Sequence, residues 1–160
     1  MNKKLLYKQL IIALEANYQI AVNAAKRAHE TATDSENIAE NRYDTLALEA
    51  SYLAQGQSQR VDECAGDLVA FEQLNIEATS FQSLVCLGAL VWLRDIDDND
   101  RYVFFGPSAG GVKVQFAEKE MIVVTPSSQL GAAINQRAAG DEVSFSIGDK
   151  VLEYEIAMIY

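Results

Sequence analysis

In the first part of the chain, apolar residues recur with steps that alternate between four and three residues. The positions that follow this pattern between residues 3 and 31 are Tyr7, Ile11, Leu14, Tyr18, Ala21, Ala25 and Ala28. This spacing is typical of the a and d positions of a coiled coil, and neither proline nor glycine interrupts it. Because the apolar residues become smaller along the segment, we expect the structure to narrow toward residue 31.

A second run with the same period follows after a few residues. Its positions are Ala39, Tyr43, Leu46, Ala50, Leu53, Gln57, Val61, Cys64, Leu68 and Phe71. Since the two runs are of similar length and their connection is short, we expect an antiparallel coiled-coil hairpin over residues 1–76, with its tip at residues 31–41. The order Thr33-Asp34-Ser35-Glu36 is typical of a capping box and predicts Thr33 as the N-cap of the second helix.

The pattern changes after a polar stretch at residues 74–83. Short strand-like runs then follow, around residues 84–93, 101–106, 112–116, 121–124, 143–147 and 151–159. Between the fourth and fifth runs, Ser127 or Ser128 can cap a short helix that ends near Arg137 and directs Leu130, Ala133 and Ile134 inward. One helix on a bent antiparallel sheet is an α+β architecture, which we predict for a second domain at residues 77–160.

Net charge limits the choice of partner. The 160-residue chain carries a formal net charge of −10 and has a pI near 4.5. Because binding to duplex nucleic acid requires clustered cations that displace counterions, we expect no direct contact with duplex DNA. A protein partner, or a metal ion held by carboxylates, fits this charge better.

Cysteine usage and the N-terminal sequence bear on the compartment. Cys64 and Cys86 both fall in apolar segments, so we expect small buried residues in a reducing environment. Polar residues interrupt the apolar positions near the N-terminus well short of the length of an export signal or a membrane span. We therefore expect a cytoplasmic monomer that contacts no membrane.

Three other features favour ordinary structural roles. The acidic segment at residues 95–100 lacks the glycine and glutamate positions of an EF-hand and predicts a solvated hairpin turn. The glycine-rich segment at residues 106–111 lacks the lysine and helix of a phosphate-binding loop and predicts a connection between strands. His29 is the only histidine, and we expect it to be an exposed helix residue.

Carboxylates gather at the expected tip. Asp34 and Glu36 stand where they would oppose the dipole of the second helix, an effect of about 0.3–1 kcal/mol for each. Glu40 and Asp44 extend a row with i, i+4 spacing from Glu36, and repulsion within such a row costs helix stability. Capping does not explain the whole row. Carboxylates at the end of a rod could instead complete the ligands of a magnesium ion already held by another protein.

The end of the chain carries motifs that, behind a helical hairpin, resemble the Gre family of bacterial transcript-cleavage factors, GreA and GreB. The family's Pro-x-Ser-Pro-Leu-Gly is similar to Pro126-Ser127-Ser128-Gln129-Leu130-Gly131, with Gln129 in place of proline. Gly140-Asp141-Glu142-Val143 and Tyr154-Glu155-Ile156 also stand in the family's order. We interpret these tail residues as structural.

The tip matches the family less closely. Gre factors have the approximate order Gly-Asp-x-x-Glu-Asn-Ala-Glu/Asp-Tyr, in which the aspartate and first glutamate are the metal-site acids. Here Glu36-Asn37 matches the Glu-Asn step, but Asp34 lies two residues before Glu36 instead of three, and no glycine precedes it.

The resemblance implies a fold and a function. The globular domain would have a sheet like that of the FK506-binding proteins (FKBP-like), and the protein would dock on bacterial RNA polymerase with its hairpin in the secondary channel. Asp34 and Glu36, aided by Glu40, would help to hold a catalytic Mg²⁺ shared with the polymerase, close to the nascent RNA 3′ end. The protein would thus be no enzyme itself, would bind no cofactor when free, and would stimulate cleavage of backtracked RNA.

Three alternatives remain open at this point. A channel binder without cleavage activity would share the fold and inhibit or modulate transcription. An FKBP-like chaperone or prolyl isomerase would need an open aromatic pocket, to which Trp92, Tyr102, Phe104 and Phe105 could contribute. A coiled-coil scaffold would form oligomers along the seam.

Overall fold

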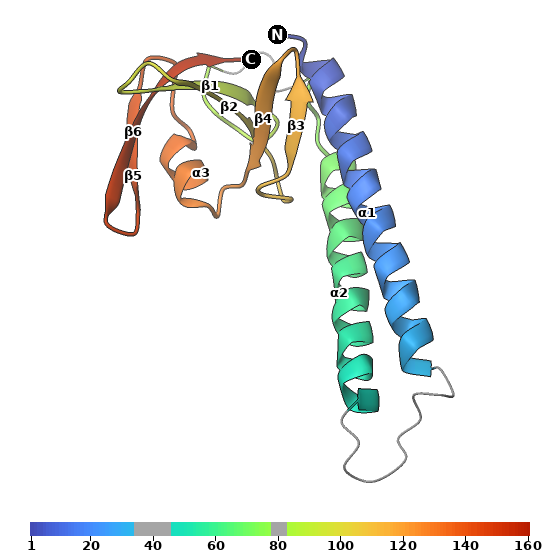
Figure 1. The fold of residues 1–160 in the computed structure, drawn as a ribbon. Coiled ribbons are helices and arrows are strands. Elements are labelled where there is room, and N and C mark those ends of the chain that lie inside the picture. Colours follow the sequence, from blue (N-terminus) through green and yellow to red (C-terminus); the bar gives the residue numbers. More distant parts are fainter. Residues whose placement is uncertain (34–45, 78–82) are drawn as a thin grey trace. The chain divides into compact units, whose positions relative to one another are not determined.

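The computed structural model describes residues 1–33, 46–77 and 83–160 of the 160-residue chain. The fold is α+β, as predicted: helices α1 (Lys3–Thr33) and α2 (Leu46–Glu72) precede a six-stranded sheet and the short helix α3 (Gln129–Ile134) (Figure 1). The chain forms two compact units. The sheet unit contains residues 1–13 and 69–160, and the helical unit contains residues 14–68. Both long helices are therefore divided between the units, and the domain boundary at residues 76 and 77 stays a prediction.

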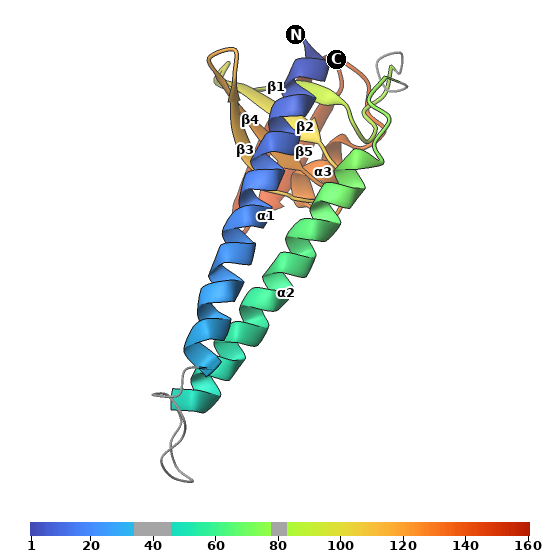
Figure 2. The same ribbon diagram turned by 90° about the vertical axis from the view of Figure 1, so that its right-hand side faces the viewer.

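In the helical unit, α1 and α2 run alongside each other (Figure 2). Leu14, Ala21 and Ala28 are buried on α1, which confirms this part of the seam, and Cys64 is buried on α2. Leu53, in contrast, is 57% exposed, so its predicted seam position is wrong. Alanines occupy the narrow part of the α1 seam, and their short side chains cannot cover a leucine on the facing helix.

At the start of α1 the buried positions also differ from the expected ones. Leu6 and Leu10 are fully buried, whereas Tyr7 and Ile11 are partly exposed. The cause is that these residues belong to the sheet unit, where elements other than a partner helix contribute to burial.

Thr33, the predicted N-cap of the second helix, is the last residue of α1. Its hydroxyl donates to the carbonyl oxygens of His29 at 2.9 Å and of Glu30 at 3.3 Å. The hydroxyl keeps its lone pairs for accepting an N–H, so these bonds do not exclude a capping role, and the capping box stays a prediction. The remaining members of the proposed box, Asp34 and Glu36, lie outside the described residues.

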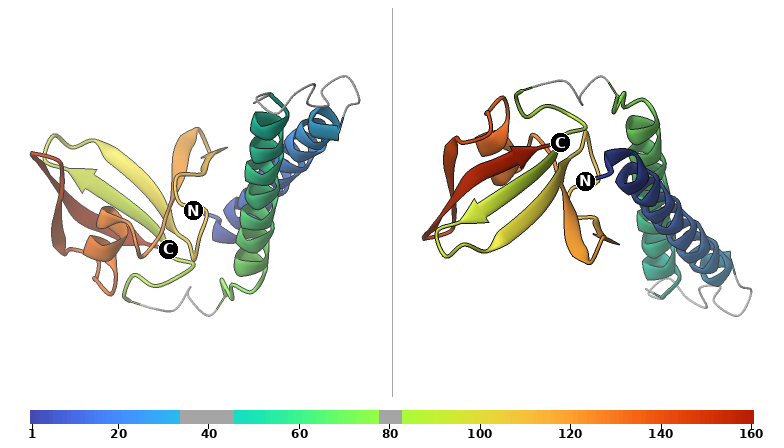
Figure 3. Two further views of the ribbon diagram at one scale, coloured as in Figure 1. Left: turned by 90° about the horizontal axis from the view of Figure 1, so that it is seen from below. Right: turned by 90° about the horizontal axis from the view of Figure 1, so that it is seen from above.

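The strands confirm most of the predicted runs and form one sheet in the order β3-β4-β2-β1-β6-β5 (Figure 3). Their bounds are β1 (Leu90–Asp95), β2 (Asp100–Phe105), β3 (Lys113–Phe116), β4 (Lys119–Val124), β5 (Glu142–Ile147) and β6 (Lys150–Ile159). The sheet is mixed and not purely antiparallel, because β2 and β4 are parallel. The β3–β4 hairpin turns back so that β4, and not β3, lies beside β2.

Only the end of the apolar run at residues 84–93 is a strand. Its first half pairs with the segment after α3: the N–H of Val85 donates to the carbonyl of Arg137 at 2.8 Å, and the N–H of Gln136 donates to the carbonyl of Val85 at 2.9 Å. Gly88 then adopts a positive φ of 89° in a turn. A fully apolar run can be buried in either conformation, so hydrophobicity alone did not reveal this turn.

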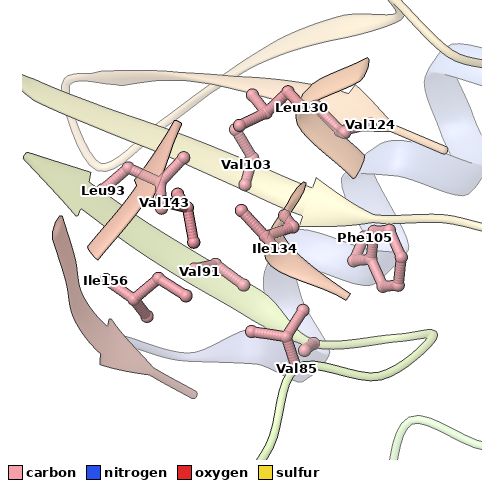
Figure 4. Packing of buried hydrophobic residues seen from close by; sticks show 11 residues of the cluster. Val85, Val91, Leu93, Val103, Phe105, Val124, Leu130, Ile134, Val143 and Ile156 are labelled. Carbon is pink, nitrogen blue, oxygen red and sulfur yellow. The ribbon is translucent and has the colours of Figure 1, made fainter. Parts of the chain in front are cut away.

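The core of the sheet unit lies between α3 and one face of the sheet (Figure 4). Alternate strand residues such as Val91, Leu93, Val103 and Phe105 meet Ile134 of α3 in this core. The face of the sheet on the other side, where the intervening strand residues point, is called the open face below. Among the described residues, no helix combines the length and the apolar character needed to cross a membrane.

Candidate functional site

The sequence-predicted tip acids, Asp34, Glu36 and Glu40, lie outside the described residues, as does Asp44. On either side of these acids, α1 ends at Thr33 and α2 begins at Leu46. At about 1.5 Å per residue, α1 with 31 residues is roughly 46 Å long and α2 with 27 residues is roughly 40 Å long. His29, near the end of α1, is exposed as expected.

The tail motif forms the N-terminus of α3. Ser128 is the N-cap: its Oγ accepts the N–H of Gly131 at 3.0 Å and donates to the carbonyl of Thr125 at 2.8 Å. The α carbon of Gly131 approaches the chain so closely that a Cβ there would lie 1.8 Å from the Thr125 oxygen. Leu130 enters the core. The motif is therefore explained by capping and packing.

The two remaining tail motifs hold β5 against β6. Gly140 has a φ of 89°, and its N–H donates to the carbonyl of Ile156 at 2.8 Å, while the N–H of Ile156 donates to the carbonyl of Asp141 at 2.9 Å. The Asp141 carboxylate accepts the N–H of Ala138 at 2.9 Å. Val143 and Ile156 are core residues. These motifs position a strand pair and contain no assembled catalytic group.

The acidic segment after β1 is a hairpin turn, as predicted. The Asp95 carboxylate accepts hydrogen bonds from the backbone N–H groups of Asp97 at 2.9 Å and Asn99 at 2.8 Å, and from the Asn99 side chain. The bonds from Asn99 hold the pKa of Asp95 below its usual value. Within residues 1–33, 46–77 and 83–160, no group of three or more His, Cys, Asp or Glu side chains could hold a metal ion.

An aromatic and charged cluster lies on the open face, where β1 and β2 pair. Trp92 and Tyr102 are directly opposite each other and stack with ring centroids 6.0 Å apart. The Arg94 guanidinium lies 5.0 Å from the Trp92 ring centroid, and Trp92 Nε1 donates to Asp100 at 2.7 Å. Lys119 donates to the Tyr102 hydroxyl, and this bond raises the pKa of Lys119. Each polar group has a partner, so the cluster is fully explained as a cross-strand arrangement.

The aromatic residues do not form the open pocket that a prolyl isomerase would need. Phe104 and Phe105 are at most 1% exposed, and Tyr102 is 5% exposed. In the described part of the chain, two surface hollows of about 440 and 580 Å³ are lined mainly by charged and polar residues. No observation favours the isomerase alternative.

Sequence reasoning missed the packing of the helix ends against the open face. Phe104 of β2 stacks on Phe71 of α2 with ring centroids 5.9 Å apart. The ring centroids of Phe104 and Tyr7 of α1 are 6.4 Å apart. The Tyr7 hydroxyl donates to the carbonyl of Phe71. The alternation in β2 could have signalled this contact, because Phe104 and Phe105 point to opposite faces and yet both are large and apolar.

Burial shifts the pKa values of three side chains of the sheet unit, Lys3, Tyr7 and Cys86. Lys3 is 7% exposed and donates to the carbonyl of Tyr160 at 2.9 Å. Its burial lowers the pKa of Lys3, and burial likewise raises the pKa values of Tyr7 and Cys86. Cys86 lies in a half-buried turn and not in a strand. None of these groups lines one of the two hollows.

The described architecture is a pair of long helices joined to an α+β sheet domain with a capped short helix. No protein-family model matches the sequence, and no curated protein matches it. Among solved structures, the chain is similar to GreA factor homolog 1 (Gfh1) of Thermus thermophilus, at 16% identity over 96% of this chain and 92% of that chain, with a TM-score of 0.39. The chain is also similar to Gfh1 of Thermus aquaticus, at 18% identity over 96% of this chain and 93% of that chain, with a TM-score of 0.41.

GreA/GreB from Nitrosomonas europaea, described as a prokaryotic transcription elongation factor, shares 18% identity over 70% of this chain and 91% of that chain, with a TM-score of 0.35. These structural neighbours are Gre-family factors.

Proposed function

We propose that the chain is a Gre-like factor that binds bacterial RNA polymerase and places its helical hairpin in the secondary channel. The observation that carries the proposal is the tail motif Pro126–Gly131, in which Ser128 and Gly131 make the contacts that fix the start of α3. These residues are those that resemble the Gre motif, and they follow two helices of 31 and 27 residues.

The charge of the chain supports a protein partner. A net charge of −10 opposes binding to duplex DNA, because such binding depends on clustered cations. A narrow acidic rod would instead suit a channel whose active site holds divalent cations. Contact with nascent RNA would then be confined to its 3′ end, beside the polymerase metal ions.

The finer proposal concerns the tip. Asp34 and Glu36, with Glu40 beside them, would help to hold the second catalytic Mg²⁺ and the attacking water, and the polymerase would hydrolyse backtracked RNA by a two-metal mechanism. Magnesium gives up its waters reluctantly, so two carboxylates on a free rod would bind it only weakly. The protein would have no activity alone, and Mg²⁺ would be shared with the polymerase.

The experiment uses the full chain and stalled, backtracked polymerase complexes, with the lengths of the RNA ends as the readout. We expect the wild-type protein to shorten the RNA and the double variant Asp34→Ala/Glu36→Ala to bind polymerase without doing so. The control is Glu15→Ala/Asp62→Ala, which removes two exposed acids elsewhere on the helices. This control should cleave like the wild type.

Two other outcomes would change the proposal. If the wild-type protein competes for the polymerase channel but never shortens the RNA, the protein is a channel binder that inhibits or modulates transcription, and the tip acids act as helix-capping residues. If the protein does not bind polymerase at all, the Gre-like proposal fails.

A further inference from the structure

β5 forms an open edge of the sheet. It is the outermost strand beyond β6, with which it pairs along its whole length without a shift in register (Figure 1). Its sequence, Glu-Val-Ser-Phe-Ser-Ile, contains neither lysine nor proline. Charged side chains, proline and bulges are the usual features that keep an edge strand from pairing with another chain. β5 contains no proline and no bulge, and its one charged residue, Glu142, is the first residue of the strand.

The opposite edge of the sheet is better protected. β3 has only four residues and begins with Lys113. The Lys113 ammonium forms an ion pair of 3.0 Å with Glu120 of β4. A short edge strand that carries a lysine is a poor template for another strand. The β3 edge is therefore protected against pairing with another strand, whereas the β5 edge is not.

The hydrogen-bonding groups of the β5 edge can be assigned from the register. Ile156 donates to the carbonyl of Asp141, and in an antiparallel pair every second residue directs its N–H and C=O groups to the neighbouring strand. Val143 and Phe145 thus bond to β6, whereas Glu142, Ser144 and Ser146 direct their backbone groups outward. All three are exposed. No hydrogen bond from another segment of the described chain reaches these outward groups.

The side chains beside this edge define what would fit. On the core side, Val143 and Phe145 alternate with the outward residues and end at Ile147, which is 58% exposed. On the open face, Glu142 lies directly opposite Glu155, and both are exposed. Like charges directly opposite each other are destabilising. A cation placed beside Glu142 would relieve this repulsion.

A surface hollow of about 440 Å³ lies next to the edge. Its lining includes the carboxylates of Asp95, Glu142, Glu153 and Glu155, with Arg94 as the one cation. The hollow thus has room for a long basic side chain and an excess of negative charge to attract it. The edge and the hollow are independent features that point to the same ligand.

We propose that the β5 edge binds an extended segment of a partner protein in which apolar residues alternate with lysine or arginine. The segment adds to the sheet as a further strand through main-chain hydrogen bonds. Its apolar side chains continue the face that carries Val143 and Phe145, and its cations lie on the open face beside Glu142 and the hollow. This inference concerns the free protein and does not depend on the proposed function.

The probe is a fluorescent peptide with acetyl and amide ends, Thr-Val-Lys-Val-Lys-Val-Thr, whose binding to the full chain is followed by fluorescence anisotropy. A peptide of the same composition but without alternation, Thr-Val-Val-Lys-Lys-Val-Thr, controls for general attraction to an acidic protein. We expect the alternating peptide to bind about tenfold more tightly than this control, since only the alternating peptide can satisfy both faces of the sheet.

Protein variants locate the site. Ser144→Pro removes one outward N–H without touching the bonds to β6, and we expect it to weaken binding about tenfold. Gln115→Pro is the matched control on the other edge: the bond from Val123 to the carbonyl of Val112 makes the backbone groups of Gln115 point outward as well. We expect this variant to bind like the wild type.

A second variant covers the event that Ser144→Pro fails to fold. Glu142→Lys leaves the backbone unchanged and reverses the charge beside the edge, and we expect about fivefold weaker binding of the lysine peptide. Equal binding of the alternating and non-alternating peptides would overturn the proposal. So would unchanged binding by a folded Ser144→Pro, or a dimer of the free protein that Ser144→Pro converts to a monomer, because a second copy would then occupy the edge.

Discussion

At the scale of single residues, Gly131 is a position where the structure leaves no room for a side chain. A Cβ at this position would lie 1.8 Å from the carbonyl oxygen of Thr125 and 2.9 Å from the Ser128 hydroxyl oxygen. Because the obstructing atom is backbone, Gly131→Ala has to move the loop and break the cap of α3. We expect a loss of about 3 kcal/mol in the free energy of unfolding, the upper part of the range for overpacking. Urea unfolding followed by Trp92 fluorescence measures it.

Gly66 provides the matched control. It lies inside α2 and has nothing within 4 Å of the position that a Cβ would take. Gly66→Ala should therefore stabilise the helix by about 1 kcal/mol, since alanine loses less backbone entropy and has the higher helix propensity. Similar losses in both alanine variants would show that the contact with Thr125 is not the cause.

Because of Tyr7, we expect the free energy of unfolding of the sheet unit to fall at alkaline pH. Burial raises the pKa of Tyr7 above its ordinary value of 10.0, and the negative charge of Glu72 raises it further. The folded state thus favours the neutral phenol, and this contribution is complete below about pH 10 and lost as the pH rises through the folded-state pKa. Tyr7→Phe should lower the free energy of unfolding by about 1 kcal/mol near neutral pH.

The difference between wild type and Tyr7→Phe should then shrink as the pH rises above about 10, because the wild type alone loses this contribution. Urea unfolding at several pH values, read by Trp92 fluorescence, tests this. Other titrating groups are common to both proteins and cancel in the comparison. A difference that stays constant up to high pH would mean that Tyr7 ionises as easily in the folded state as in the unfolded state.

Among the elements, the β3–β4 hairpin carries a turn whose residues do not suit its geometry. Ala117 and Glu118 have φ values of 51° and 61°, between the paired residues Phe116 and Lys119. Two-residue turns with positive φ at both positions favour Asn-Gly, because other residues meet steric conflict there. Ala117→Asn and Glu118→Gly should each stabilise the protein by about 1 kcal/mol.

The matched control is Glu120→Gly, which places the same residue in β4 instead of in the turn. Glu120 pairs with Lys113 at 3.0 Å, and a glycine inside a strand loses both the pairing and backbone order, so this variant should be less stable by about 1 kcal/mol. Thermal unfolding of the three variants measures the changes. A destabilising effect of Glu118→Gly would contradict the account of the turn.

The elements also show how far periodicity predicts a fold. The period of α1 and the short apolar runs gave the right element types, because one buried face imposes its own spacing on the sequence. Periodicity could not reveal that β4 lies parallel to β2, since pairing partners are not encoded in the spacing of one strand. It also missed the turn at Gly88, because the residues on both sides of this glycine are apolar and continue the strand-like run.

The same limits apply to the candidate site. Ser128 as a cap was within reach of sequence reasoning, since capping is local chemistry. The close contact of Gly131 with Thr125 was not, because it depends on how the loop folds back. Thr33 ends α1, and its predicted role as a cap of the second helix stays a prediction. The tip acids Asp34, Glu36 and Glu40 lie outside the described residues and stay a prediction from the sequence.

At the scale of the whole molecule, substitutions on α1 test whether the helical unit and the sheet unit unfold together. Leu14 is 2% exposed in the helical unit, and Ile12, two residues earlier on the same helix, is 63% exposed. Leu14→Asp buries a carboxylate in place of a leucine and should cost about 4 kcal/mol or more, whereas Ile12→Asp should cost less than about 1 kcal/mol.

If the two units are independent, Leu14→Asp removes helical circular dichroism and leaves the unfolding transition of the sheet unit in place. Trp92 reports this transition without interference, because it is the only tryptophan and lies in β1. Ile12→Asp should leave both signals as in the wild type. If Leu14→Asp instead abolishes the Trp92 transition together with the helical signal, the helices α1 and α2, which continue from one unit into the other, couple the units. The long helices then fold only as extensions of the sheet unit.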